Sequence, residues 1–335
     1  MMSSIPELDI SIVVPVYFNE GSLALTLSSI KTDFIAGRPG LTWEVIFVDD
    51  GSGDGSLDEL QRLRGQNPTT VRIVKLTRNF GQVNALLAGF TLARGACAVA
   101  ISADGQDPPA LINEMFDAYS RDEAEIVACA RHGRDESLYR IWTSRVFYRL
   151  IRWFSFPNMP QEGFDFVLVG RRPLAALLRN PDASPFFQGQ LLWTGYPIKF
   201  INYRRQARRV GKSRWTFGKK LTVLIDGVMG YSFFPIRLIS FTGLVAALLG
   251  FLYALVIFVN KMVFGNPVQG WTPLMITVLV IGGFQMLMLG VVGEYVWRTL
   301  AQVRNRDRYL IDAVYEVDGA AAGQHERRGL ERVAG

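Results

Sequence analysis

The chain has 335 residues, enough for about two domains, with 49% hydrophobic residues and a formal net charge of +6 at pH 7. Its two histidines are too few for a histidine-based metal site, and each of its two cysteines lies in an apolar stretch typical of a reduced core residue. The basic residues gather beside the apolar part of the chain, which disfavours a nucleic-acid-binding protein.

Apolar, β-branched runs alternate with helical patterns through the first 130 residues. We expect strands at 10–16, 43–48, 71–76, 97–101 and 125–130, with helices at about 21–30, 56–64 and 82–93. This alternation, with nearly continuous apolar strands, predicts an α/β fold whose mostly parallel sheet is covered on both faces. Because the crossovers are right-handed, the carboxyl ends of the strands should share one edge.

Polar clusters follow four of these strands, so we expect them to meet at that edge, where open α/β sheets bind ligands. The clusters are residues 17–20, 49–54, 78–81 and 104–107. Asp49 and Asp50 suit a ribose hydroxyl or a base N–H, and the guanidinium of Arg78 suits phosphate oxygens. Together the clusters predict a pocket for a nucleoside diphosphate.

The segment C-A-V-A-I-S-A-D-G-Q-D-P-P at 97–109 contains the candidate metal ligands. Asp104 and Gln106 alternate along an extended chain, so both can point the same way, and their oxygens suit a hard divalent cation that holds phosphates. Taken alone, the segment is equally a polar turn with an aspartate helix cap. A calcium loop starting at Asp50 is disfavoured, because its twelfth position is Gln61 rather than glutamate.

Residues 138–156 place four arginines among large aromatic and aliphatic residues at helical spacing. This pattern suits a helix lying in a membrane interface, and an ordinary packed helix with solvated arginines is the alternative. Asp165 interrupts the apolar run 163–168. A lone carboxylate there is costly unless it is paired or functional, so Asp165 is a site candidate.

Nine lysines and arginines lie within residues 199–220. They suit acidic lipids beside a membrane. The motif G-K-S-R-W at 211–215 also has the glycine, hydroxyl, cations and aromatic ring of a loop that clamps a lipid-linked phosphate. Residues 216–235 then form an amphipathic juxtamembrane segment in our interpretation.

Two long uncharged stretches follow. Residues 238–260 would span roughly 35 Å as a helix, enough for a hydrocarbon core of about 30 Å, and a second span covers about 273–293. Two buried core helices are the alternative. Basic residues flank both outer ends, so the positive-inside rule predicts a hairpin at 236–297 in the cell (inner) membrane, with both termini cytoplasmic. We expect residues 298–335 to form a basic tail, disordered from about 317.

The motifs resemble those of family 2 glycosyltransferases of GT-A fold. They are V-V-P-V-Y-F-N-E, V-D-D-G-S-G-D, T-R-N-F-G-Q, S-A-D-G-Q-D-P-P and G-K-S-R-W, in this order before the hairpin. The resemblance spans roughly residues 8–310. The most similar branch is the polyprenyl-phosphate glycosyltransferases, which include dolichol-phosphate mannose synthases and bactoprenol glucosyltransferases.

This resemblance implies a GT-A domain at 1–215, a UDP- or GDP-sugar donor, Mg²⁺ or Mn²⁺, and a polyprenyl phosphate acceptor such as undecaprenyl phosphate. It implies that four residues bind the nucleotide, in addition to the candidate Asp50: Pro15, Tyr17, Glu20 and Asp49. It places Asp104 and Gln106 at the metal and diphosphate, and Asp165 near the reacting sugar. The amphipathic helices and the hairpin also allow self-association into a homo-oligomer.

Four residues of the basic segment are implied near the acceptor phosphate: Arg208, Arg209, Ser213 and Arg214. One position departs from the family pattern. The family usually reads D-A-D-x-Q at the metal motif, whereas Ser102 replaces the first aspartate here and removes one negative charge from the pocket. Metal affinity and donor choice depend on that charge.

The acceptor determines the expected mechanism. A phosphate monoester is largely dianionic at neutral pH, so no strong general base is needed. The protein must instead bring two anionic groups together and stabilise the leaving diphosphate. We predict in-line displacement with inversion, with Asp104, Asp165 and Arg78 as the catalytic residues.

Two other functions remain open. A polysaccharide synthase shares the fold, but residues 188–193 lack the arginine of its Q-x-x-R-W element, and two spans make no channel. A non-catalytic membrane protein that binds nucleotide sugar is favoured only by the substitution at Ser102.

Overall fold

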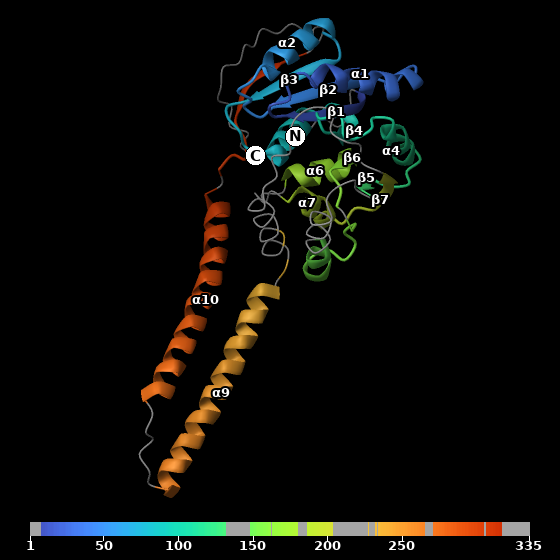
Figure 1. Cartoon of the computed structure of the whole chain (residues 1–335). Coiled ribbons are helices and arrows are strands. Elements are labelled where there is room, and N and C mark those ends of the chain that lie inside the picture. Colours follow the sequence, from blue (N-terminus) through green and yellow to red (C-terminus); the bar gives the residue numbers. More distant parts are fainter. Residues whose placement is uncertain are drawn as a thin grey trace. The chain divides into compact units, whose positions relative to one another are not determined.

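The computed structural model describes residues 8–131, 148–161, 163–179, 186–203, 227, 232, 234–264, 271–304 and 306–316 (Figure 1). The chain divides into two compact units. One comprises Met1–Asp226 together with Asp307–Gly335, and the other comprises Gly227–Arg306. The first unit therefore takes chain from both sides of the second.

An eight-stranded sheet forms the centre of the first unit, in the order β7-β5-β6-β4-β1-β2-β3-β8. Its strands are β1 (Leu8–Val16), β2 (Trp43–Asp49), β3 (Val71–Leu76), β4 (Gly95–Ala100), β5 (Ile126–Arg131), β6 (Phe166–Gly170), β7 (Ile198–Tyr203) and β8 (Ile311–Tyr315). The strands β6 and β8 are antiparallel to their neighbours, and the other six point the same way. The mostly parallel sheet is thus confirmed, and all five expected strands are present.

Helices cover both faces of this sheet. They are α1 (Leu23–Asp33), α2 (Ser56–Gln66), α3 (Gln82–Leu92), α4 (Leu111–Ser120), α6 (Arg171–Arg179) and α7 (Phe187–Trp193), with a 3₁₀ turn at Ile35–Gly37. Side chains of α1, α2 and α4 share one core cluster with Ile12 and Val14 of β1. The opposite face of β1 meets α3, where Gly89 lies directly against Val13. Burying each such aliphatic side chain contributes about 1.5–3 kcal/mol.

The carboxyl ends of six strands therefore share one edge of the sheet with the amino ends of β6 and β8. Neighbouring strands are in register there, because Val16 of β1 lies opposite Asp49 of β2, and Asp49 lies opposite Lys75 of β3. We call this edge, with the loops that leave it, the carboxyl edge. Cys97 and Cys129 are buried free thiols in β4 and β5, as expected from their apolar surroundings.

The strand β8 corrects the expectation that residues 298–335 form a tail. The preceding helix continues to Val303, and β8 then pairs antiparallel with β3 at the end of the sheet. The amide of Thr77 donates to the carbonyl of Leu310 at 3.0 Å. In the structure, residues 311, 313 and 315 of this strand are half-buried, whereas 312 and 314 are exposed.

The second unit contains two long helices, α9 (Phe234–Phe264) and α10 (Trp271–Val303), which run side by side in Figure 1. Both are long and apolar enough to cross a membrane, with mean hydropathies of 2.5 over Ile236–Asn260 and 1.4 over Val280–Val303. Both expected spans fall within these helices. A side chain at Gly243 of α9 would lie 2.9 Å from Met288 of α10, so the missing side chain permits this close packing.

Several expected features lie wholly or partly outside the described residues. The proposed interface helix is described only from residue 148, and residues 148–154 are helical with Trp153 74% exposed. The juxtamembrane segment 216–235, most of the basic segment from residue 204 and the tail from residue 317 are likewise outside the described part, apart from residues 227, 232, 234 and 235.

Candidate active site

The loops after β1 and β2 are bonded to each other. The amide of Phe18, whose φ is 56°, donates to Ser52 Oγ at 3.1 Å. The amide of Gly55, at the start of α2, donates to Glu20 Oε2 at 3.0 Å. Glu20 therefore holds the two loops together and places negative charge at a helix amino end, which is favourable. Tyr17 is 37% exposed at the top of this loop pair.

Asp49 is the last residue of β2 and Asp50 follows it directly; both are buried, with 1% and 2% of their surface exposed. Asp49 Oδ1 accepts a hydrogen bond from the Ser52 amide at 3.1 Å. Burial raises the pKa of both carboxyl groups, although hydrogen bonds from the main chain partly offset that shift. The carboxyl edge thus holds two adjacent acids whose charged forms would be stabilised by an incoming hydrogen-bond donor or cation.

The two acids have different partners. The oxygens of Asp50 accept the amides of Phe80 at 2.7 Å and Gly81 at 2.9 Å, which fixes the loop after β3. This arrangement favours a positioning role for Asp50 over the nucleotide contact that we expected. Asp49 stays the nucleotide candidate, with Pro15 one strand away, opposite Val48.

The loop after β3 carries Arg78. Its guanidinium carbon lies 4.1 Å from the ring centre of Phe80, and its Nη1 donates to the carbonyl of Asn79 at 3.2 Å. The main chain of Arg78 also packs directly on Gly51, where an added Cβ would lie 2.7 Å from the Arg78 carbonyl carbon. Asp50 and Gly51 thus contact the main chain of this loop, from which the Arg78 side chain extends.

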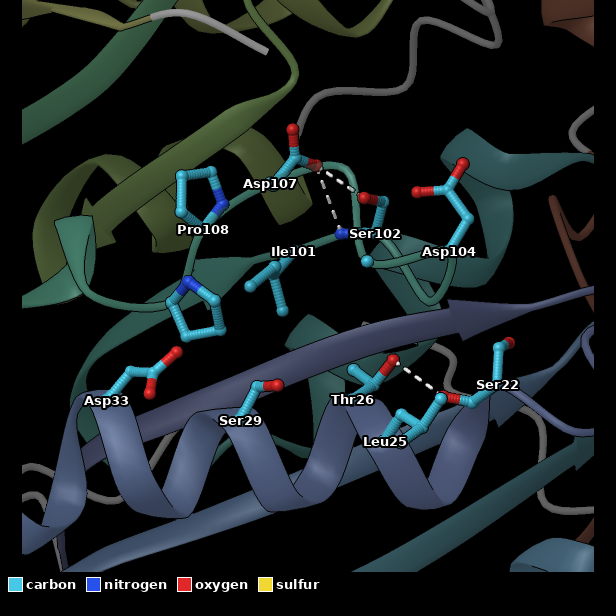
Figure 2. A pocket seen from close by; sticks show the side chains of 12 residues that line it. Ser22, Leu25, Thr26, Ser29, Asp33, Ile101, Ser102, Asp104, Asp107 and Pro108 are labelled. Atoms are coloured by element: carbon cyan, nitrogen blue, oxygen red, sulfur yellow. Dashed lines mark hydrogen bonds between the residues drawn. The ribbon is translucent and has the colours of Figure 1, made fainter. Parts of the chain in front are cut away.

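The loop after β4 contains the expected metal ligands, Asp104 and Gln106. Asp104 Oδ1 accepts the amide of Gln106 at 3.2 Å. The carbonyl of Ala103 accepts hydrogen bonds from Ser22 Oγ at 2.9 Å and Thr26 Oγ1 at 3.1 Å, which ties the loop to α1. A pocket of about 50 Å³ separates this loop from α1, and Figure 2 shows Asp104 at its rim.

The hydroxyl of Ser102 bonds a carboxylate of its own loop. Its Oγ donates to Asp107 Oδ2 at 2.5 Å, and Asp107 Oδ1 accepts the hydroxyl of Tyr203 at 2.7 Å (the serine bond is dashed in Figure 2). Where the family pattern has a carboxylate, this chain has a hydroxyl donor that bonds a neighbouring carboxylate. The motif does not predict the bond from Tyr203 to Asp107, because these two residues are far apart in sequence.

Asp165 lies directly before β6, and therefore at the carboxyl edge rather than inside a strand as expected. Its Oδ1 accepts a hydrogen bond from Gln188 Nε2 on α7 at 2.6 Å. The sequence reading missed Gln188, because residues 188–193 were noted only for a missing arginine. The carboxylate is paired, as its cost in an apolar run requires.

The residues present fit a divalent cation at Asp104 and Gln106. Magnesium is commonly bound by one or two carboxylates together with substrate phosphates and water, rather than by a full protein cage. In the described ranges, no group of three or more histidine, cysteine, aspartate or glutamate residues could hold a metal ion. The expected acceptor residues Arg208, Arg209, Ser213 and Arg214 lie outside the described part of the chain and stay predictions.

Comparison with known proteins agrees with this geometry. The model of the family described as Glycosyl transferase family 2 matches residues 11–178, from β1 into α6. An uncharacterized glycosyltransferase of Synechocystis sp. is 32% identical over 93% of this chain and 97% of that protein. A prophage-derived bactoprenol glucosyl transferase of Shigella flexneri is 31% identical over 90% of this chain and 97% of that protein.

A solved structure of glucosyl-3-phosphoglycerate synthase from Mycobacterium tuberculosis, with Mn²⁺ and UDP, is less similar. Its TM-score is 0.48 and its identity 17%, over 67% of this chain and 81% of that one, which is too low to say what this chain binds. The match of the family model over half of the chain, and relatives above 30% identity along nearly its whole length, establish the family. The chain belongs to glycosyl transferase family 2.

Proposed function

We propose that this glycosyltransferase transfers a sugar from a UDP- or GDP-sugar to a membrane polyprenyl phosphate, with inversion at the anomeric carbon. One observation carries the proposal: a family 2 domain and two helices of membrane-spanning length belong to one chain, and the similarity to a bactoprenol glucosyl transferase extends over both. The product is a lipid-linked sugar that suits modification of cell-envelope glycans or glycolipids.

The donor lies at the carboxyl edge in this proposal. Asp49 takes the nucleoside, Arg78 takes diphosphate oxygens, and Asp104 with Gln106 would hold Mg²⁺ or Mn²⁺. A bound divalent cation supplies positive charge to the leaving diphosphate. Arg78 supplies further positive charge from a loop whose main chain Asp50 and Gly51 contact. A preorganised charge of this kind stabilises the transition state without reorganisation during the reaction.

The acceptor needs orientation more than activation. Its phosphate is largely dianionic at neutral pH and serves directly as the nucleophile. The bond from the anomeric carbon to the donor diphosphate breaks as the acceptor oxygen bonds to the opposite face of that carbon. In this proposal Asp165, whose Oδ1 accepts a hydrogen bond from Gln188, bonds a hydroxyl of the sugar. The basic segment after Tyr203 would hold the acceptor phosphate through Arg208, Arg209, Ser213 and Arg214.

The membrane is the proposed location of the enzyme. The helices α9 and α10 form the spanning hairpin, and the basic residues beyond both outer ends favour a cytoplasmic position for both termini. Outside the hairpin, a surface hollow is lined by Arg149, Arg152 and Trp153 together with Leu150 and Pro157. Exposed tryptophan beside arginine suits the level of the lipid headgroups.

Replacing Asp104 tests the proposed reaction. Full-length protein in vesicles with undecaprenyl phosphate is incubated with labelled UDP- or GDP-sugars, and the lipid product is identified by mass. We expect Asp104→Ala to reduce transfer by at least about 10³-fold, because the proposed cation loses its carboxylate ligand. Asp58→Ala, which removes an exposed acid of α2, is the matched control. Near-normal transfer by Asp104→Ala contradicts the proposal.

The acceptor assignment has its own test. The double variant Arg208→Ala/Arg209→Ala should raise the KM for polyprenyl phosphate far more than the KM for the sugar donor. If these arginines only contact acidic lipids, the change in KM should depend on the anionic lipid content of the vesicles, and both KM values should stay unchanged in detergent. If the wild-type protein binds donor but forms no lipid-linked sugar with any donor, the protein is a non-catalytic binder of nucleotide sugar and the proposed function is wrong.

A further inference from the structure

Asp107 is a buried carboxylate at the carboxyl edge for which neither the motif nor the proposed reaction provides a role. Only 3% of its surface is exposed. Oδ2 accepts Ser102 Oγ at 2.5 Å and the Ser102 amide at 3.4 Å, while Oδ1 accepts the Tyr203 hydroxyl at 2.7 Å. Figure 2 shows the serine half of this arrangement above the loop.

These bonds connect two distant parts of the sheet. Ser102 begins the loop that carries Asp104 and Gln106, directly after β4. Tyr203 is the last residue of β7, and the strands β6 and β5 lie between β4 and β7. Asp107 therefore spans the carboxyl edge from the metal loop to the end of the sheet.

The ring of Tyr203 extends the connection to the strand beside Asp165. Its centre lies 6.3 Å from that of Phe166, at an interplanar angle of 76°, which is a favourable edge-to-face contact. Phe166 directly follows Asp165. In sequence, Tyr203 is also the residue from which the chain enters the basic segment. The metal loop and the strand that follows Asp165 thus share one anchor.

A carboxylate is the group that suits this place. The three groups named above are donors, namely two hydroxyls and one amide, and an ionised carboxylate only accepts. An asparagine would have to turn its NH₂ group toward one of these donors. Ser102 is likewise suited, because its hydroxyl supplies a proton that a carboxylate at this position would not.

We propose that Asp107 is a positioning residue, which acts through Ser102 and Tyr203 to hold the metal loop at a fixed place relative to Asp165. It touches no substrate in this role, which rests on the proposed transfer to polyprenyl phosphate. Its contribution lies in the geometry of attack, where a misplacement of about 1 Å can cost about 10²-fold in rate.

The readout that separates positioning from ligand binding is the partition of the donor sugar between two acceptors. Transfer to polyprenyl phosphate requires the donor and the acceptor to be held at the correct relative position. Slow transfer to water requires only that the donor be held. Full-length protein in vesicles is assayed for both products with the labelled donor, and donor KM and the metal concentration for half-maximal rate are measured.

Tyr203→Phe is the most conservative variant, because it removes one hydroxyl and keeps the ring. We expect its kcat for lipid transfer to fall about 10-fold, and that of Asp107→Asn about 10²-fold, with donor KM, metal requirement and water transfer within about twofold of wild type. In the double variant Asp107→Asn/Tyr203→Phe, the two losses should not multiply, because both remove the same bond.

Tyr119→Phe is the matched control. Its hydroxyl donates to the carbonyl of Ala96 at 3.1 Å, so it removes a similar bond near the amino end of β4. Equal effects of Tyr203→Phe and Tyr119→Phe on transfer overturn the proposal. So does a loss of water transfer and metal response in Asp107→Asn that matches Asp104→Ala, since Asp107 would then be a ligand. If wild-type protein makes no lipid product, the proposed function fails instead.

Discussion

Strand β2 has buried carboxylates near both of its ends, and the groups that contact these carboxylates differ between the two ends. Near the amino end, Glu44 is 1% exposed and pairs with Arg72 at 3.0 Å and Arg94 at 3.2 Å. At the carboxyl end, Asp49 and Asp50 are equally buried, but main-chain amides are their hydrogen-bond donors. The same strand thus faces cations at one edge of the sheet and backbone dipoles at the other.

The pKa shifts have opposite signs for this reason. Burial alone would raise the pKa of Glu44, but the charge of Arg72 and hydrogen bonds from Ser11 and Arg94 outweigh it and lower the pKa. At Asp49 and Asp50, burial dominates and raises the pKa. Near the amino end of β2, arginines of the protein itself compensate the charge of the buried carboxylate. At the carboxyl edge, a ligand can still stabilise the ionised form of the buried acids.

Removing an ion-pair partner of Glu44, near the amino end of β2, should have the largest effect on stability. Arg72→Met leaves the buried Glu44 carboxylate without its closest guanidinium and should lower the free energy of unfolding by about 3–5 kcal/mol, measured by urea unfolding in detergent. The double variant Glu44→Met/Arg72→Met should recover much of this loss. A loss below about 1 kcal/mol in the single variant would show that Arg94 alone compensates the carboxylate.

Two glycines of the carboxyl edge allow a smaller and more local test. Gly51 and Gly81 have φ values of 69° and 94°, and alanine in this region costs about 1–2 kcal/mol. An added Cβ at Gly81 meets no atom within 4 Å, whereas at Gly51 it would lie 2.7 Å from the Arg78 main chain. Gly51→Ala should therefore destabilise more than Gly81→Ala, and only Gly51→Ala should also raise the donor KM. Equal effects on KM would contradict the proposed placement of Arg78.

The pH dependence of stability should differ in sign between the two edges. Glu44 stabilises the fold above its ordinary pKa of about 4.3, and this contribution is lost as the pH falls through the lowered pKa of the folded state. Asp49 has a raised folded pKa, so its ionisation opposes folding as the pH rises from about 3.9 through that value.

Urea unfolding of Glu44→Gln and Asp49→Asn between pH 3 and 8 compares the two directly. Glu44→Gln should be less stable than wild type near pH 7, and Asp49→Asn more stable, with both differences shrinking toward pH 3. Asp49→Asn should nonetheless bind the nucleoside diphosphate less tightly. A loss of stability in both variants near pH 7 would remove the contrast between the edges.

The smallest effect is expected at an exposed pair. Lys75 Nζ lies 2.6 Å from Asp312 of β8, with 34% and 47% of these side chains exposed. Lys75→Met should change the free energy of unfolding by less than about 1 kcal/mol, because solvent screens such pairs. A larger loss would mean that this exposed pair contributes more to the attachment of β8 to β3 than solvent screening allows.

The sequence predicted features that depend on local pattern. The strands β1 to β5 follow from their apolar runs, and the meeting of Asp49, Arg78 and Asp104 at one edge follows from right-handed connections between parallel strands. The pairing of Gln188 with Asp165, and of Tyr203 with Asp107, could not be predicted. Each is a side-chain contact between distant segments, set by how far one strand or helix extends past its neighbour.

The role of Asp50 shows the same limit. Its place after a buried strand made it a candidate for ligand contact, as for Asp49. The two neighbours differ because successive side chains of a strand point to opposite sides, so one meets the loop after β3. The residue types and their positions were sufficient to predict that both acids lie at the carboxyl edge. They did not predict which of the two acids bonds the loop after β3.

The late position of β8 in the chain has a consequence for biogenesis. Until residues 311–315 leave the ribosome, β3 has an open edge, and both long apolar helices must be synthesised before that. Open strand edges invite pairing with other chains. The nascent domain is therefore incomplete during the interval in which a spanning hairpin would insert, and the final strand closes its sheet only afterwards.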